Sequence, residues 1–176
     1  MISKERIKEE IIEWGKAFLV VFVFIWVMTT FIAQPYMVDG PSMNPTLQNT
    51  ERLVVNKFIY HFKSPERGDI IVFDYPSDRS RQFIKRVIAV GGDTIEIIDG
   101  MVFVNDKLIK EPYISEPPIR DYPKATVPQG TYFVMGDNRN NSEDSRFADV
   151  GFVPLDYIKG QAVAVYSPFS HFRSLR

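Results

Sequence analysis

A serine and a lysine are the residues of this chain best suited to covalent chemistry. The sequence of 176 residues contains no cysteine, which rules out a thiolate nucleophile and cysteine metal ligands. A hydroxyl nucleophile needs a base, and the usual base is histidine. The only two histidines, His61 in IYHFKSP and His171 in SHFRSLR, stand in contexts typical of solvated or packing residues. The candidate base is therefore a lysine.

A lysine acts as a base only after it has lost its proton, and Lys85 stands where burial could achieve this. At a reference pKa of ~10.4 only about one lysine in 2,500 is neutral at pH 7, so the side chain must be desolvated. Lys85 lies in the apolar run QFIKRVIAVGGD, where strand alternation puts Lys85 and Arg86 on opposite faces. Lowering the pKa to ~7 to 8 would cost the fold about 3 to 5 kcal/mol. A lysine on a solvated strand face is the alternative.

Ser42 is the candidate nucleophile because of the turn in which it lies. In VDGPSMNPTL, Gly40, Pro41 and Pro45 predict a tight turn that could direct the Ser42 hydroxyl and amide toward a substrate carbonyl. A serine that only caps the turn is the alternative.

The segment GDNRNNSEDSR, residues 136–146, gathers polar side chains directly after the apolar run TYFVM. Such a cluster is typical of a loop that makes many hydrogen bonds near a site. It superficially resembles a calcium loop, but the alternating ligand spacing that ends in a distant glutamate is missing. A surface loop held by an ion pair between Asp144 and Arg146 is compatible with either interpretation.

The elements that must position these residues are predicted to be strands. Short runs rich in Val and Ile, separated by turn residues, favour strands over helices. They cover residues 53–56, 70–74, 83–90, 94–98, 101–105, 131–135 and 161–166. We expect a mainly β protein with a single curved or partly barrel-like β domain.

Turn residues connect these runs. Asp99 with Gly100 predicts a tight hairpin, and Asn105 with Asp106 predicts a second turn. The prolines between 112 and 128 predict a long irregular stretch over the surface. A short helix is expected near residues 154–158.

The segment 17–33 carries no charge and predicts a membrane anchor ahead of the β domain. As a helix it covers roughly 25 Å, slightly less than a hydrocarbon core of ~30 Å. A cleavable signal peptide would need a small-x-small site, but Phe31 stands two residues before Ala33. A buried helix of a soluble domain would show an amphipathic stripe instead.

The distribution of basic residues predicts the orientation of this anchor. The basic residues before it are Lys4, Arg6, Lys8 and Lys16. None follows until Arg52, so the N-terminus is expected in the cytoplasm. The predicted organisation is a cytoplasmic tail over 1–16, a single transmembrane anchor over 17–34, and an extracytoplasmic β-rich domain over 35–176, held at the cell membrane. The 21 basic and 22 acidic residues give no net basic charge, which argues against a nucleic-acid partner.

Three segments in order, SMNPT at 42–46, KRVIAVGGD at 85–93 and GDNRNNSEDSR at 136–146, resemble the bacterial type I signal peptidases, or leader peptidases, in their short Gram-positive-like form. The resemblance covers nearly the whole chain. It implies a serine endopeptidase that removes signal peptides from exported preproteins after small residues, at Ala-x-Ala sites. It implies neither a cofactor nor a metal.

The resemblance also implies roles for individual residues. Ser42 would be the acylating nucleophile and Lys85 the general base. Ser142 would hold the Lys85 amine by a hydrogen bond, with Asp144 and Arg146 as a supporting ion pair. The residues expected to bind an extended substrate are Tyr36, Met37, Val38, Asp39, Gln82, Phe83 and Ile84.

The oxyanion site departs from the pattern of some relatives. They carry a serine two residues before the nucleophile, and this chain has Gly40 there. The Ser42 amide remains as one donor, and the Gly40 amide or a water is the candidate second donor.

Two other functions are compatible with parts of the sequence. A self-cleaving protease of the SOS-repressor type shares the serine and lysine chemistry, but it would be soluble and carry a DNA-binding helical module. A membrane-anchored β binding domain without catalysis would account for the anchor and the strands, but it leaves the three motifs unexplained.

Overall fold

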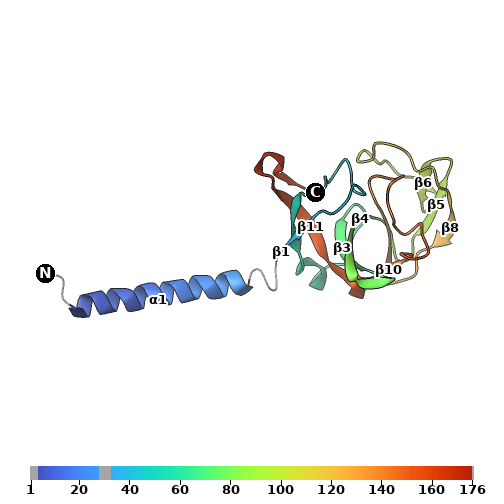
Figure 1. The fold of residues 1–176 in the computed structure, drawn as a ribbon. Coiled ribbons are helices and arrows are strands. Elements are labelled where there is room, and N and C mark those ends of the chain that lie inside the picture. The colour runs from blue at the N-terminus through green and yellow to red at the C-terminus, as the bar shows by residue number, and fades with distance from the viewer. Residues whose placement is uncertain (1–3, 28–32, 176) are drawn as a thin grey trace.

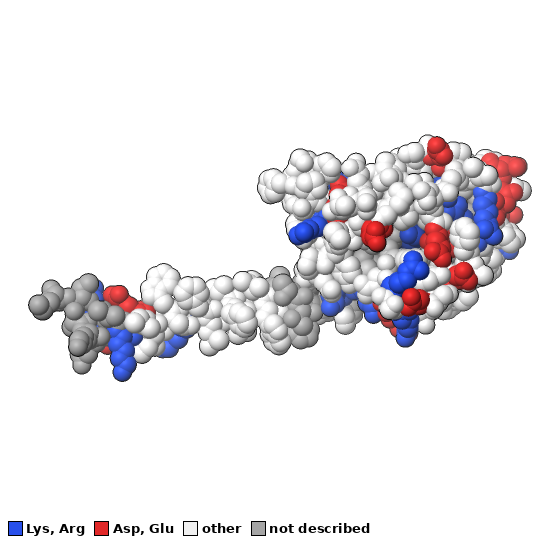
Figure 2. Space-filling model, viewed as in Figure 1, with Lys and Arg blue, Asp and Glu red and all other residues white. Residues whose placement is uncertain are grey.

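The computed structural model describes residues 4–27 and 33–175 (Figure 1). The N-terminal helix α1 (Lys4–Val27) carries its charged residues between Lys4 and Lys16, and its remaining part, up to Val27, is uncharged. Figure 2 shows these charges gathered toward the N-terminal end of the helix. Residues 28–32 of the predicted anchor lie outside the described residues. Within the described ranges, no helix combines the length and the apolar composition that a membrane crossing requires.

A large antiparallel sheet forms most of the β structure. Its spatial order is β1 (Ala33–Met37), β2 (Arg52–Asn56), β11 (Ile158–Ser167), β3 (Ile70–Tyr75), β4 (Asp78–Val90), β9 (Thr131–Met135) and β10 (Val153–Pro154), with β12 (Arg173–Ser174) pairing β11. Figure 1 shows how strongly this sheet curves. The order is open, because β1 and β10 stand at its two ends. The predicted mainly β fold is therefore confirmed, but the sheet does not close into a barrel.

A second, four-stranded sheet lies on the side of the β structure away from β1 (Figure 1). Its order is β7 (Lys107–Leu108), β6 (Met101–Val104), β5 (Thr94–Ile98) and β8 (Tyr122–Thr126). Both predicted turns are confirmed, since Ile98 pairs with Met101 and Val104 with Lys107. The turn residues all have positive φ, as such hairpins require: Asp99 51°, Gly100 75°, Asn105 54° and Asp106 61°.

Strand β8 corrects the expectation of an irregular stretch between 112 and 128. Pro123 lies inside this strand, but β8 is the edge of the small sheet, where a missing backbone N–H is tolerated. Strand β4 also begins five residues before the predicted run 83–90. The helix expected near 154–158 is a single 3-10 turn, Leu155–Tyr157; two similar turns are Ile59–His61 and Phe169–His171.

Strand β3 lies at the centre of the core and is buried along its whole length. Ile70 and Val72 pack into one apolar cluster, and Ile71 and Phe73 pack into another on the opposite face. Because a strand buried on both faces needs apolar residues at nearly every position, its sequence reads IIVFDY rather than alternating. Strand β4 pairs with β3 and is buried from Lys85 to Ala89, whereas its first five residues are exposed.

Candidate active site

The Ser42 turn is fixed to the core on both sides. Gly40 has a φ of +89°, in the left-handed region that favours glycine. Asn44 N–H donates to Pro41 O at 3.0 Å, closing the turn around Ser42. The side chains of Met43 and Leu47 are fully buried in the cluster beneath it. The backbone next to the Ser42 hydroxyl is therefore held rigidly.

Lys85 reaches this turn from β4, where it pairs with Ile71 of β3. It is 4% exposed, and its Nζ lies 2.8 Å from Ser42 Oγ. Burial lowers the pKa of Lys85 to about 8, although the nearby carboxylates of Asp144, Glu143 and Asp137 oppose the shift. Within the part of the chain that the structure describes, no carboxylate forms an ion pair with this amine. Lys85 can therefore supply a neutral amine near physiological pH.

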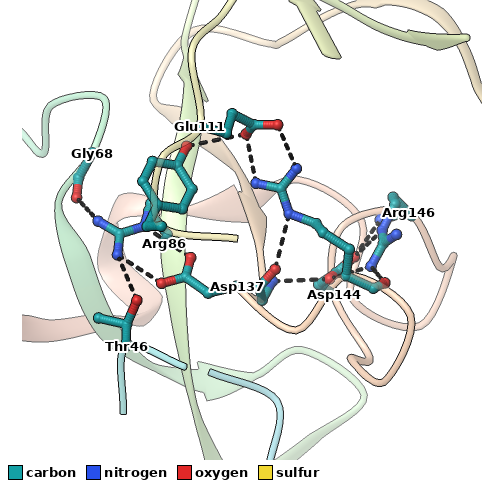
Figure 3. A network of polar contacts seen from close by, with 10 residues as sticks. Thr46, Gly68, Arg86, Glu111, Asp137, Asp144 and Arg146 are labelled. Carbon is teal, nitrogen blue, oxygen red and sulfur yellow. Dashed lines mark hydrogen bonds and ion pairs between the residues drawn. The ribbon is translucent and has the colours of Figure 1, made fainter. Parts of the chain in front are cut away.

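Arg86, the next residue, takes the opposite face of β4 because the pairing with β3 runs without a bulge from Ile84 to Arg86. Figure 3 shows its guanidinium paired with Asp137 and Gly68. Its Nε and Nη2 donate to the two carboxylate oxygens of Asp137 at 2.8 and 2.6 Å. Its Nη1 also donates to Gly68 O at 2.9 Å. This pair joins β4 to the loop that begins at Gly136.

The loop 136–146, called the catalytic loop below, contacts the Ser42 turn directly. Asn138 N–H donates to Ser42 O at 3.0 Å, and Asn138 Nδ2 donates to Pro41 O at 3.2 Å. A Cβ at Gly136 would overlap Ser142 Oγ and Ser42 O, so only glycine fits between these two segments. The loop thereby holds the backbone of the Ser42 turn in place.

Asp144 and Arg146 form a buried ion pair inside this loop. Arg146 Nε donates to Asp144 Oδ1 and Arg146 Nη2 to Asp144 Oδ2, both at 2.8 Å. Asp144 Oδ2 also accepts the Gly136 N–H at 3.0 Å. The pair therefore ties the end of the loop to its beginning.

The Ser142 hydroxyl does not make the hydrogen bond that the resemblance implies. Its Oγ is buried beside Gly136 and has no hydrogen-bond partner among the described residues. The Lys85 amine is hydrogen-bonded to Ser42 instead.

A cleft of about 340 Å³ opens beside Ser42 and Lys85. All the predicted substrate-binding residues line it: Tyr36, Met37, Val38, Asp39, Gln82, Phe83 and Ile84. Sequence reasoning missed four further lining residues: Met43, Val72, Arg81 and Glu143. Met43 and Glu143 flank motif residues already singled out. Val72 is brought to the cleft by its pairing with Ile84 of β4, which no local pattern reveals. Arg81 directly precedes Gln82 on β4.

The oxyanion prediction requires one correction. The Gly40 N–H donates to Asn49 Oδ1 at 2.9 Å, so it is already engaged and is not the second donor. The reason is that the turn returns at Asn49, whose side chain reaches back across it. The Ser42 N–H makes no hydrogen bond within the described residues and stays available.

The two histidines lie outside the cleft. His171 Nδ1 is 2.8 Å from Glu51 Oε1, and His61 packs against the Phe58 ring. Neither lines the cleft that contains Ser42.

Comparison with known proteins places this arrangement in a family. A family described as signal peptidase, peptidase S26, matches residues 11–167. Signal peptidase I P of Bacillus subtilis subsp. natto is 37% identical over 99% of this chain and 100% of its own length. A probable signal peptidase I-1 of Synechocystis is 43% identical over 89% of this chain and 83% of its own. The crystal structure of a signal peptidase I from Enterococcus faecalis V583 superposes with a TM-score of 0.51 at 33% identity, covering 56% of this chain and 97% of that one.

The matched region extends from Ile11, within α1, to the end of β11 and includes Ser42, Lys85 and the whole loop 136–146. A buried lysine amine beside a serine hydroxyl and relatedness over nearly the full length lead to one assignment: this chain belongs to the signal peptidase family, peptidase S26.

Proposed function

We propose that Ser42 and Lys85 are the dyad with which this signal peptidase cuts signal peptides from exported preproteins. One observation carries the proposal: the Lys85 amine is buried, lacks a carboxylate partner among the described residues and lies 2.8 Å from the Ser42 hydroxyl. An amine in this state is a base of the right strength within reach of a proton that it can remove.

The chemistry follows from that geometry. Neutral Lys85 takes the Ser42 proton while Ser42 Oγ attacks the substrate carbonyl, and the oxyanion that forms accepts a hydrogen bond from the Ser42 N–H. The Lys85 ammonium then gives its proton to the departing amine, which leaves an ester on Ser42. A water attacks this ester with Lys85 again as base, and the ester bond breaks to regenerate the hydroxyl.

The walls of the cleft suit an extended substrate. Tyr36 and Met37 come from β1, and Gln82 to Ile84 come from β4, so a chain laid between them would run beside two strands. Apolar side chains of Met43, Val72 and Ile84 line the cleft, and Ile84 is the one that is partly exposed there. These walls favour small side chains on the substrate, as at an Ala-x-Ala site.

We also propose that the predicted anchor over 17–34 is a single-pass anchor with a cytoplasmic N-terminus, except that Ala33 and Gln34 pair with β2 and so belong to the outer domain. The uncharged run 17–33 and the absence of Lys and Arg between 17 and 51 support this assignment. Because β1 begins at Ala33 and Ser42 follows nine residues later, the dyad would stay near the lipid surface, where an anchored substrate presents its cleavage site.

Incubation of the detergent-solubilised protein with a labelled preprotein tests the reaction. The unmodified protein is expected to cut after a small residue, and Ser42→Ala and Lys85→Met are each expected to abolish the cut. Lys124→Ala, at an exposed ion pair on the small sheet, is the matched control and should cut normally. Cleavage by either dyad variant would refute the dyad, and no cleavage by the unmodified protein would favour the non-catalytic binding domain.

The anchor has a separate test, because the chain contains no cysteine of its own. In spheroplasts, a membrane-impermeant thiol reagent should label a Lys107→Cys variant but not a Ser3→Cys variant. Labelling of both in intact spheroplasts would contradict the topology.

A further inference from the structure

The catalytic loop is held from outside by a residue of the small sheet region. Glu111, labelled in Figure 3, lies in the connection between β7 and β8. Arg139 lies in the catalytic loop. Arg139 Nη1 and Nη2 donate to the two oxygens of Glu111 at 2.7 and 2.5 Å. The Arg139 side chain is fully buried and that of Glu111 is 8% exposed. Such a bidentate pair fixes direction as well as distance.

Arg139 passes this constraint to the rest of the loop. Its Nε donates to Gly136 O at 3.1 Å, and its own carbonyl accepts a hydrogen bond from Arg146 Nη2 at 2.6 Å. Arg146 in turn is paired with Asp144, which accepts the Gly136 N–H. The guanidinium of Arg139 therefore links Glu111 to the hydrogen bonds that join the beginning and the end of the loop.

Tyr113 reinforces the same point from a second direction. Its hydroxyl donates to Glu111 Oε1 at 3.0 Å. The guanidinium carbon of Arg86 lies 4.0 Å from the centre of its ring, and that of Arg139 lies 5.9 Å away. Glu111 is thus connected both to the catalytic loop and to the neighbour of Lys85 on β4.

The position of the loop determines the position of the nucleophile. Asn138 N–H donates to Ser42 O, and Gly136 fits between Ser42 O and Ser142 with no space for a methyl group. A shift of the loop must therefore move the Ser42 turn relative to Lys85, and the hydrogen bond of 2.8 Å between them would be lost.

We propose that Glu111, with Tyr113 as its support, is a positioning residue for the cleavage reaction. The proposal rests on the proposed function of the Ser42 and Lys85 dyad. Neither residue belongs to the three motifs that indicate the family. Without the Glu111 carboxylate, Arg139 would be a buried charge with no counter-ion, and it would turn toward solvent and take the loop with it.

The enzymatic test compares Glu111→Gln with the unmodified full-length protein on a labelled preprotein. Gln has nearly the same shape as Glu but no charge. We expect kcat to fall about 10- to 100-fold, because small displacements of reacting groups have effects of this size. KM should stay within about twofold, since Glu111 does not line the cleft. Glu111→Asp, which keeps the charge, should recover part of kcat, and Tyr113→Phe should lower kcat less than Glu111→Gln.

Asp93→Asn is the matched control for a general loss of stability. Asp93 lies between β4 and β5 and is also mostly buried. It pairs with Arg67, and neither of these two residues contacts the catalytic loop among the contacts of the described residues. This variant should lower the melting temperature while kcat per folded molecule stays unchanged. An equal fall of kcat in Asp93→Asn and Glu111→Gln would overturn the positioning role.

Hydrogen exchange gives a readout that does not depend on activity. In Glu111→Gln the amides of Gly136 and Asn138 should lose protection, since their acceptors are Asp144 and Ser42 O. Amides of the β5–β6 hairpin should be unaffected. Failure of the unmodified protein to cut would refute the proposed function alone, and exchange would still decide the role of Glu111. Unchanged hydrogen exchange at the amides of Gly136 and Asn138 would overturn the positioning role of Glu111.

Discussion

The two faces of strand β4 each bury a basic side chain, but they give it different partners. Lys85 and Arg86 are adjacent, and they are 4% and 8% exposed. On one face the Lys85 amine is hydrogen-bonded to the Ser42 hydroxyl, and among the described residues no carboxylate forms an ion pair with it. On the other face the Arg86 guanidinium meets the two oxygens of Asp137, with Gly68 O as a further acceptor.

The difference shows which kind of burial serves chemistry and which serves structure. A guanidinium stays charged, so burying it requires a counter-ion and further hydrogen bonds. An amine has a second option, which is to lose its proton. Arg86 has the carboxylate of Asp137 as its counter-ion, whereas Lys85 has none, so the neutral form of the amine is favoured and can serve as a base.

The largest effect on stability is expected from Arg86→Met, which would leave Asp137 buried without its cation. The free energy of unfolding should fall by about 3 to 5 kcal/mol. Chemical denaturation measures this change. The double variant Arg86→Met/Asp137→Leu should recover part of the loss, because it removes the orphaned charge as well. A loss below about 1 kcal/mol in the single variant would erase the contrast between the two faces.

Lys85→Met is expected to act in the opposite direction. At pH 7 the unmodified fold keeps the amine dry, and burial holds its pKa at about 8, well below the ordinary lysine value of 10.5. Replacing it should leave the free energy of unfolding unchanged or raise it by up to about 3 kcal/mol, while cleavage is lost. A marked fall in stability would mean that the ammonium form makes structural interactions.

The pH dependence of stability and of cleavage distinguishes the amine of Lys85, which can lose its proton, from the guanidinium of Arg86, which stays charged. Between pH 8 and 10.5 the folded state binds fewer protons at Lys85 than the unfolded state does, so stability from this group rises with pH. The stability advantage of Lys85→Met should therefore be fully present below pH 8 and disappear as the pH approaches 10.5. In the unmodified enzyme kcat/KM should rise with pH toward a plateau, with a midpoint near 8. A profile that is flat from about pH 6 to about pH 9 would contradict this.

Gly136 connects the surroundings of Lys85 and Arg86. It directly precedes Asp137, the partner of Arg86, and it contacts the Ser42 turn. Gly136→Ala should destabilise the fold by about 1 to 3 kcal/mol through overpacking. Cleavage should fall further than stability explains, because the added methyl group displaces Ser42 O. Melting curves combined with cleavage rates per folded molecule would detect this; normal rates would show that the turn adapts.

The smallest effect is expected for a cation that is not buried at all. Lys124 on β8 pairs with Asp106, and both side chains are largely exposed. Lys124→Ala should leave the melting temperature and the cleavage rate unchanged within error, because surface ion pairs are screened by water. A clear fall in melting temperature or cleavage rate would show that exposed basic residues also matter, contrary to the contrast between buried and exposed cations.

Local signals were sufficient for much of the fold. The turn at Asp99 and Gly100 needs only two residues that tolerate positive φ. The apolar runs located the buried parts of the central strands, because burial is reflected in a few adjacent residues. They missed the polar beginning of β4, Asp78–Gln82, and the first three residues of β11. Strand β8 was missed since Pro123 is acceptable only at a sheet edge, and edge status depends on distant pairing.

The sequence by itself supplied candidates for the chemistry: in a chain without cysteine, a serine in a tight turn and a lysine in an apolar run could serve as nucleophile and base, and the resemblance carried by three ordered segments assigned them those roles. Only the tertiary structure decided the partners of those groups. It brought Lys85 to 2.8 Å from Ser42, gave the Gly40 amide to Asn49, left Ser142 Oγ without a partner among the described residues and linked Glu111 to Arg139. Each of these contacts joins segments far apart in the chain or depends on how a side chain packs, and hydrogen bonding and desolvation are set by neighbours in space rather than by neighbours in sequence.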